Sequence, residues 1–310
     1  MIITLNMTRN DGSCDDAGME LQQLRYVVAV AETRSFTRAA QQCHVVQSAL
    51  SHQVAKLERE IGARLFDRTS RRVDLSAAGE AFLPAAREAL DAAERARAEA
   101  AAVSGVVSGR LRLGAIPTVT AYDLPSLLRD FRAAHPRVDV SLRTDGSQEL
   151  VAQIATGTVD IAFLGLPPGR VPRGVRSRIA GRGEHVAVVA PDHPLADEHR
   201  TDLASLAPYP FVDFTAGTPG RLQVDEAFAA AGVERHVAFE VTTGDLAAGL
   251  VAQRLGIALL PGAYAATLAG VRTVEIADAP VREEHVAWSR HRPSPAAAAF
   301  LEMLAASSAG

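Results

Sequence analysis

Apolar side chains recur at helical spacing near the start of the chain. Leu21, Leu24, Val28 and Ala31 fall on one face of a predicted helix that ends near Thr33. The other faces of this segment are mostly polar, as expected for a helix with one buried side. The pattern therefore predicts a short amphipathic helix that packs against further elements.

A second helix is predicted directly after the first. Ser35 is placed to cap it, because its hydroxyl can accept a hydrogen bond from a backbone N–H at the start of a helix. Phe36, Ala39 and Ala40 form its apolar face. Two adjacent alanines on that face allow another helix to approach closely. The helical pattern breaks around residues 43–46.

A third helix begins near Gln47 and places Leu50, Val54, Leu57 and Ile61 on its buried stripe. Glutamine pairs with adenine, serine bonds to any base edge, and the start of a helix attracts phosphate. We therefore expect the polar side chains of its first turns to contact DNA. These side chains are Gln47, Ser48, Ser51 and His52.

A short basic hairpin is predicted after the third helix, which should stop at Gly62. Apolar residues on each side of the turn predict two short strands, and Arg68, Arg71 and Arg72 lie at or near its tip. Such arginines suit contact with the DNA backbone or the minor groove. A polar helix face with a few arginines is usually only a solvated surface. The added hairpin favours DNA binding.

The segment from Leu21 to Gly79 resembles the winged helix-turn-helix domain of LysR-type transcriptional regulators. The matching residues are Glu32, Ser35, Phe36, Thr37, Ala39, Ala40, Gln47, Ser48, Ala49, Leu50, Ser51, Gln53, Leu57, Glu58, Gly62, Leu65, Phe66, Arg68, Arg72, Leu75, Ala78 and Gly79. The resemblance implies double-stranded DNA as a partner. It implies DNA contacts by Arg34, Ser35, Thr37, Gln47, Ser48, Ser51, His52, Arg68, Arg71 and Arg72.

Three departures from the family pattern affect this surface. Arg34 stands where the family often has glycine, and His52 stands where arginine is frequent. A base contact by His52 would be weaker and sensitive to pH. Val46 occupies a position often held by serine or threonine, so the third helix lacks a side-chain cap at its start.

The distribution of charge supports a DNA-binding segment at the N-terminus. The chain has 310 residues, enough for two or three domains, and a net charge of −4. Residues 19–78 contain nine Lys and Arg against six Asp and Glu, a balance of +3, so the remainder carries −7. DNA responds to the local field, because salt screens charges beyond about 10 Å.

Several other classes of protein are disfavoured. Cys14 and Cys43 form neither a disulfide framework nor a metal site, and no apolar run reaches transmembrane length. His185, His193 and His199 lack metal-ligand spacing, and no serine has a neighbouring base pattern. We therefore expect no enzyme, cofactor, metal or membrane association, and a cytoplasmic, nucleoid-associated protein.

The domain boundaries follow from composition and from the resemblance. Residues 1–18 are polar and are expected to be a disordered tail; translation from Met1, Met7 or Met19 stays open. The winged domain covers 19–77, and an Ala-, Glu- and Arg-rich segment at 78–103 predicts a long helix. In the family this linker helix pairs with a second copy, which implies a homodimer and, through the effector domains, a homotetramer. A hinge is expected at 104–109.

Strands alternate with helices over residues 110–306, which predicts an open α/β sheet. One helix is expected to start at Thr118 and another at Ser147. This region resembles the two-lobed effector domain of the family, with the fold of type 2 periplasmic binding proteins. We assign lobe I to about 110–166 and 264–306, and lobe II to about 167–263. The overall fold class is therefore α/β, behind an all-α winged helix-turn-helix and a linker helix.

Hydroxyl side chains cluster where ligands bind in such sheets, beyond the carboxyl ends of the strands. Each of them alone could be only a helix cap. Their expected convergence on one cleft suits a small molecule that is polar or carries a carboxylate. The candidate effector-binding residues are Thr118, Thr120, Ser147, Leu164, Thr215, Thr218 and Thr242.

These features predict a LysR-type transcriptional regulator whose activity depends on a small molecule bound between two lobes. Contact with RNA polymerase is a further expectation. Two alternatives stay open at this point. A periplasmic solute receptor shares the two-lobed fold but has no use for residues 21–79, and an α/β enzyme would need the catalytic set that is missing.

Overall fold

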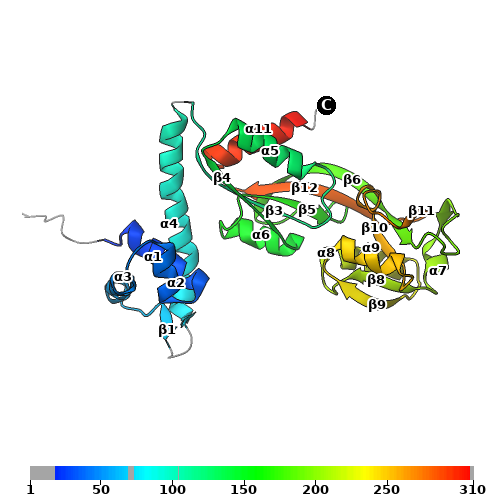
Figure 1. Ribbon diagram of the computed structural model, residues 1–310, viewed down its shortest axis with the longest axis horizontal. Coiled ribbons are helices and arrows are strands. Elements are labelled where there is room, and N and C mark those ends of the chain that lie inside the picture. The colour runs from blue at the N-terminus through cyan, green and yellow to red at the C-terminus, as the bar shows by residue number, and fades with distance from the viewer. Residues whose placement is uncertain (1–17, 69–72, 104, 308–310) are drawn as a thin grey trace, which may run out of the picture. The chain divides into compact units, whose positions relative to one another are not determined.

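The computed structural model describes residues 18–68, 73–103 and 105–307. The chain forms two compact units, Met1–Ala93 and Glu94–Gly310, and the division lies inside one long helix (Figure 1). Among the described helices, none is both long and apolar enough to cross a membrane.

The first unit is built on the three predicted helices, and their existence and order are confirmed. They are α1 (Leu21–Thr33), α2 (Phe36–Gln42) and α3 (Gln47–Glu60). Val30, Leu50 and Leu57 are almost completely buried in one cluster with Phe36, and Leu24 is also buried. Three large apolar residues placed on the stripes are not fully buried, namely Leu21, Val28 and Ile61, and Val28 is half-buried in the middle of α1. Leu21 and Ile61 are 40% and 38% exposed, because each sits at the end of its segment.

The predicted hairpin forms from two short antiparallel strands, β1 (Phe66–Arg68) and β2 (Val73–Leu75). Helix α4 (Ala77–Ala102) follows and covers the segment predicted as a linker helix. Gly79 is required at its start, because a Cβ atom there would lie 2.1 Å from the carbonyl oxygen of Leu65. The first turn of α4 thus packs directly on the backbone before the hairpin.

The second unit contains an eight-stranded mixed sheet in the order β4-β3-β5-β12-β6-β11-β7, with β10 also paired to β6. Strand β6 (Val175–Val189) extends from lobe I into lobe II, and β12 (Val281–Ser289) begins where the chain returns to lobe I. The remaining strands of this sheet are β3 (Gly109–Ala115), β4 (Val138–Thr144), β5 (Ile161–Leu166), β7 (Arg200–Thr201), β10 (Ala258–Pro261) and β11 (Arg272–Ile276).

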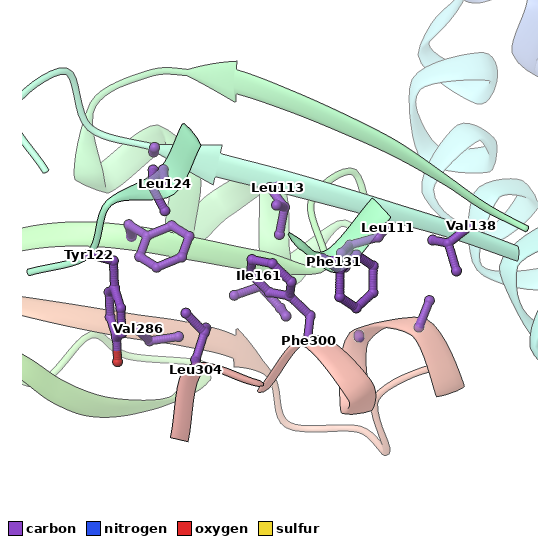
Figure 2. Packing of buried hydrophobic residues seen from close by; sticks show 14 residues of the cluster. Leu111, Leu113, Tyr122, Leu124, Phe131, Val138, Ile161, Val286, Phe300 and Leu304 are labelled. Carbon is purple, nitrogen blue, oxygen red and sulfur yellow. The ribbon is translucent and has the colours of Figure 1, made fainter. Parts of the chain in front are cut away.

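Lobe I places helices on both faces of β3, β4, β5 and β12. Helices α5 (Leu124–Ala134) and α11 (Pro295–Ser307) cover one face, and Phe131 meets Phe300 there edge to face at 5.1 Å (Figure 2). Helix α6 (Ser147–Ala155) covers the other face. Side chains along β5 alternate between the two layers, as the period of a strand requires.

Lobe II is built around the second half of β6 with β7, β10 and β11. A parallel pair, β8 (Pro210–Phe214) and β9 (His236–Val241), packs beside it through buried Phe211 and Val212. Its helices are α7 (Leu203–Leu206), α8 (Pro219–Ala230), α9 (Gly244–Ala252) and α10 (Gly262–Ala265).

The crossing between the lobes differs from the predicted boundaries at 167 and 264. The first half of β6 still pairs with β12 in lobe I, up to the pair Glu184 and Val281. Strand β11 pairs with β6 and β7, so the chain returns to lobe I only after Pro280. Pro261 and Gly262 looked like the return, but α10 and β11 follow them inside lobe II.

One predicted helix start is also wrong. Helix α5 begins at Leu124, capped by Asp123, whose carboxylate accepts a hydrogen bond from the Ser126 N–H at 3.3 Å. Thr118 lies six residues earlier in the loop after β3. Residues 1–17, Arg71 and Arg72 carry further predictions and lie outside the described residues.

Candidate functional site

The N-terminus of α3 presents polar side chains and unbonded backbone groups to solvent. Gln47, Ser48 and His52 are exposed, and Ser51 is half-buried. Val46 is 69% exposed and its side chain makes no cap hydrogen bond. The first N–H groups of α3 therefore lack a side-chain acceptor, which leaves them suited to a phosphate oxygen.

Side chains on this surface are partly pre-ordered. The Gln47 Nε2 atom donates a hydrogen bond of 2.8 Å to the Ser51 Oγ atom, so both lie on one exposed face of α3. Ser35 caps α2 as predicted, accepting from the Arg38 N–H at 3.3 Å. Thr37 is exposed on the first turn of α2.

Arg34 is exposed and adopts the left-handed conformation, with φ of 50°. This conformation favours glycine, which agrees with the frequent glycine at this position of the resembling family. Arg68 ends β1, and Arg71 and Arg72 fall outside the described residues. The structure thus groups six of the ten candidate side chains near α2 and α3, namely Ser35, Thr37, Gln47, Ser48, Ser51 and His52.

A cavity of about 520 Å³ lies between the lobes of the second unit. The N-termini of three helices border it, through Ser147 of α6, Pro219 of α8 and Thr243 before α9. Each such terminus offers backbone N–H groups and the positive end of a helix dipole. Ile116, Phe214, Val241, Leu259 and Pro261 supply the apolar part of the wall.

Five of the seven candidate effector residues border this cavity, and two do not. Thr118, Ser147, Thr215, Thr218 and Thr242 line it. The Thr120 hydroxyl instead donates to the Glu284 carboxylate at 2.7 Å. Leu164 is fully buried against α6, because successive side chains of a strand point to opposite faces, and its neighbour Gly165 reaches the cavity.

Two of the lining hydroxyls are already engaged within the protein. The Ser147 hydroxyl donates to the Gly165 carbonyl at 3.0 Å and accepts from the Gly165 N–H at 3.1 Å. The Thr218 hydroxyl donates to the Thr215 carbonyl at 2.8 Å. At Ser147 the backbone N–H group, rather than the hydroxyl, is left for a ligand, whereas the Thr218 N–H also donates to the Thr215 carbonyl, at 3.2 Å.

Arg282 holds the hydroxyl of Thr118 in place. This buried guanidinium donates 2.6 Å to the Thr118 hydroxyl oxygen and 2.7 Å to the Thr118 carbonyl. The Thr118 hydroxyl proton is thereby free to point toward a ligand. The Glu284 carboxylate balances the charge of Arg282 at 2.6 Å and also accepts from the N–H groups of Thr120 and Ala121.

His185 borders the cavity at the point where β6 crosses between the lobes. Its side chain is 3% exposed. Its backbone N–H and its Nδ1 atom both lie 2.9 Å from the Pro280 carbonyl, on the returning segment. Burial lowers the pKa of His185 to about 4; the hydrogen bond to Pro280 opposes this fall, and the charge of Arg282 reinforces it. The imidazole is therefore neutral near pH 7.

The sequence analysis missed His185, Arg282 and Tyr264, which also line the cavity. The sequence did contain a signal for Arg282, namely the polar run Arg282-Glu283-Glu284-His285. Four polar residues bounded by Val281 and Val286 are unusual in a buried strand, and all four are less than 9% exposed. No group of His, Cys, Asp and Glu with metal-binding geometry occurs within residues 18–68, 73–103 and 105–307.

Comparisons with protein families agree with this two-unit arrangement. Residues 21–80 match the model of the bacterial regulatory helix-turn-helix protein, lysR family. Residues 104–309 match the model of the LysR substrate binding domain. Together the two models span both units of the structure.

Individual relatives cover almost the whole chain. The uncharacterized HTH-type transcriptional regulator YnfL of Escherichia coli (strain K12) is 34% identical over 91% of this chain and 96% of its own. A variant of full-length OxyR from Pseudomonas aeruginosa is 27% identical, with a TM-score of 0.73 over 94% of this chain and 95% of that one.

A second similar structure is full-length CbnR complexed with its target DNA. It is 26% identical, with a TM-score of 0.68 over 93% of this chain and all of that one. YnfL is named as a transcriptional regulator, and CbnR as a LysR family transcriptional regulator. The chain therefore belongs to the LysR family of transcriptional regulators and joins a DNA-binding domain to an effector-binding domain.

Proposed function

We propose that this regulator senses a small organic anion in the cavity between its lobes. The observation that carries the proposal is the convergence of three helix N-termini, on α6, α8 and α9, at one cavity of about 520 Å³. Their N–H groups and dipoles favour negative charge. The Thr118 hydroxyl, oriented by Arg282, adds a donor from lobe I, and Thr215 and Thr242 add hydroxyls from lobe II.

The ligand would act by bridging the lobes. Ser147 and Thr118 belong to lobe I, whereas Thr218 and Thr243 belong to lobe II, and the two lobes are joined through strand β6 and the segment that returns to β12. A molecule that contacts both walls binds best at one separation of the lobes and shifts the population toward it. Coupling of that shift to DNA binding requires only that the two lobe arrangements differ in their affinity for DNA.

The DNA-binding part of the proposal rests on the exposed start of α3. Gln47 and Ser51 would contact base edges, and the N–H groups after Val46 would contact phosphate. We further propose that α4 pairs with a second copy to form a homodimer and that effector domains join two dimers into a tetramer. The complex would act on promoter DNA in the cytoplasm, in contact with RNA polymerase.

A fluorescence-anisotropy titration tests the sensing function. Labelled DNA from upstream of the protein's own gene is titrated with protein, alone and with each member of a panel of small carboxylates. At least one carboxylate should change the apparent Kd of the wild type. The Thr118→Val variant should bind the DNA normally and lose the response to that carboxylate.

Thr156→Val provides a matched control. Thr156 lies at the far end of α6, and its hydroxyl bonds only to the backbone of its own helix and to the neighbouring Thr158. This variant should keep the wild-type response. A Thr118→Val protein that responds with the wild-type dose curve would remove that hydroxyl from the effector site.

A further inference from the structure

The side chain of His185 has one polar atom that the fold leaves unused. A carbonyl oxygen can only accept, so the Nδ1 atom must donate its proton to Pro280. In a neutral imidazole the Nε2 atom then carries a lone pair and no proton. Among the described residues, none forms a hydrogen bond with this Nε2 atom, and the ring borders the cavity.

Two causes keep His185 an acceptor rather than a donor. The ring is 3% exposed, and burial disfavours its charged form. The positive charge of Arg282 acts in the same direction. The same field disfavours a ligand ammonium group beside the ring. The complementary partner is therefore a neutral hydrogen-bond donor, and a hydroxyl group meets this requirement.

The rest of the polar wall has the opposite preference. The helix N-termini offer N–H donors, and the Thr118 hydroxyl can donate because its oxygen already accepts from Arg282. The carboxylates on the wall, Asp145 and Asp245, already have partners. Asp145 accepts from the Gly146 N–H and from Gln153, and Asp245 accepts from the Tyr264 hydroxyl. His185 is thus a buried acceptor in a cavity whose other buried polar groups mostly donate.

We propose that the effector is a hydroxycarboxylate whose hydroxyl group donates a hydrogen bond to the Nε2 atom of His185. This inference rests on the proposed anion site and specifies the second chemical group of its ligand. The carboxylate lies against the helix N-termini, and the hydroxyl lies at the crossing of β6. Contact at His185 places the ligand beside the hydrogen bonds that join Glu184–His185 to Pro280–Val281.

A ligand without the hydroxyl would leave this buried acceptor without a partner. An unsatisfied buried group costs enough to weaken binding by about 10- to 100-fold. The inference therefore predicts a preference of that size within a pair of ligands that differ only in one hydroxyl.

Isothermal titration calorimetry on the full-length protein measures the preference directly. The probes are matched sets: propionate with lactate and 3-hydroxypropionate, succinate with malate, and benzoate with its 2-, 3- and 4-hydroxy derivatives. Each is titrated into the wild type, into His185→Asn and into His199→Asn. The asparagine amide of the first variant can still donate to Pro280 but has no atom at the position of Nε2. His199 is an exposed histidine of lobe II and serves as the control.

The expected result is a preference of about tenfold or more for a hydroxylated member in at least one set, present in the wild type and His199→Asn and absent in His185→Asn. Carboxylates that bind the wild type without such a preference overturn the inference and leave the anion site intact. A preference that survives in His185→Asn removes His185 from recognition. Failure of every carboxylate to bind contradicts both this inference and the proposed function. The wild-type comparison decides the preference even if His185→Asn does not fold.

Discussion

Acidification should destabilise the effector-binding unit through His185. The pKa of this group is about 4 in the folded protein and about 6.5 in the unfolded chain. Between these values the unfolded chain binds a proton that the folded protein does not. The free energy of unfolding therefore falls as the pH falls below about 6.5, and the full loss is reached below about 4.

The magnitude follows from the size of the shift. Each unit of pKa difference corresponds to 1.36 kcal/mol, so the full penalty is about 3 kcal/mol. At pH 5 about 2 kcal/mol of it is already present. Burial in an almost completely enclosed position is the cause, because a charged imidazole there loses its hydration.

Urea unfolding of the wild type and of His185→Asn, at pH 7.5 and at pH 5, isolates this contribution. Trp288 is the only tryptophan of the chain and packs against the lobe I core, so its fluorescence reports on the effector-binding unit. The pKa values of His285 and His193 are also lowered by burial, but both groups are present in both proteins and cancel. The wild type should lose about 2 kcal/mol more than the variant on going to pH 5. Equal losses in the two proteins would refute the buried neutral imidazole.

Four further changes test other parts of the structure. Gly79→Ala should lower the free energy of unfolding of the winged domain by about 2–3 kcal/mol in a urea titration, because its Cβ atom would overlap the carbonyl of Leu65. Arg34→Gly should raise that free energy by about 0.5–1 kcal/mol, since it relieves a left-handed backbone; unchanged stability would argue against strain there. Gln47→Ala should reduce discrimination between operator and random DNA by about 1–3 kcal/mol in anisotropy titrations, and an equal loss on both DNAs would argue against a base contact. Arg72→Ala should weaken binding to all DNA and flatten the salt dependence by about one unit of slope, whereas an unchanged slope would place Arg72 outside the interface.

Local patterns were enough to predict the DNA-binding domain. The three helices, the Ser35 cap and the two strands of the hairpin each follow from residues that are close in the sequence, and the structure confirms them. The exposed face of α3 followed from the same period. The predicted stripes were wrong at Leu21 and Ile61, because the core does not extend to the ends of its helices, and at Val28, because α1 buries Val27 and Val30 instead.

The cavity was predictable only in part. The hydroxyl residues before predicted helices include five residues that line the cavity, although Thr118 lies in a loop. His185 and Arg282 were missed because they meet through the pairing of β6 with β12, which are about a hundred residues apart in the sequence. Buried charges in β12 also hide the apolar signal of a strand, and the hydrogen bonds from Arg282 to the distant Thr118 cannot be seen from local sequence.

The central claim is that a ligand in the cavity between the lobes changes how the protein occupies its DNA. A DNase I footprint on the DNA upstream of its own gene tests this most directly, with and without the hydroxycarboxylate that binds tightest in calorimetry. The claim predicts that saturating ligand changes the length or position of the wild-type footprint, and that Thr118→Val keeps the footprint of the free protein. Identical wild-type footprints at ligand concentrations that saturate the cavity would contradict it.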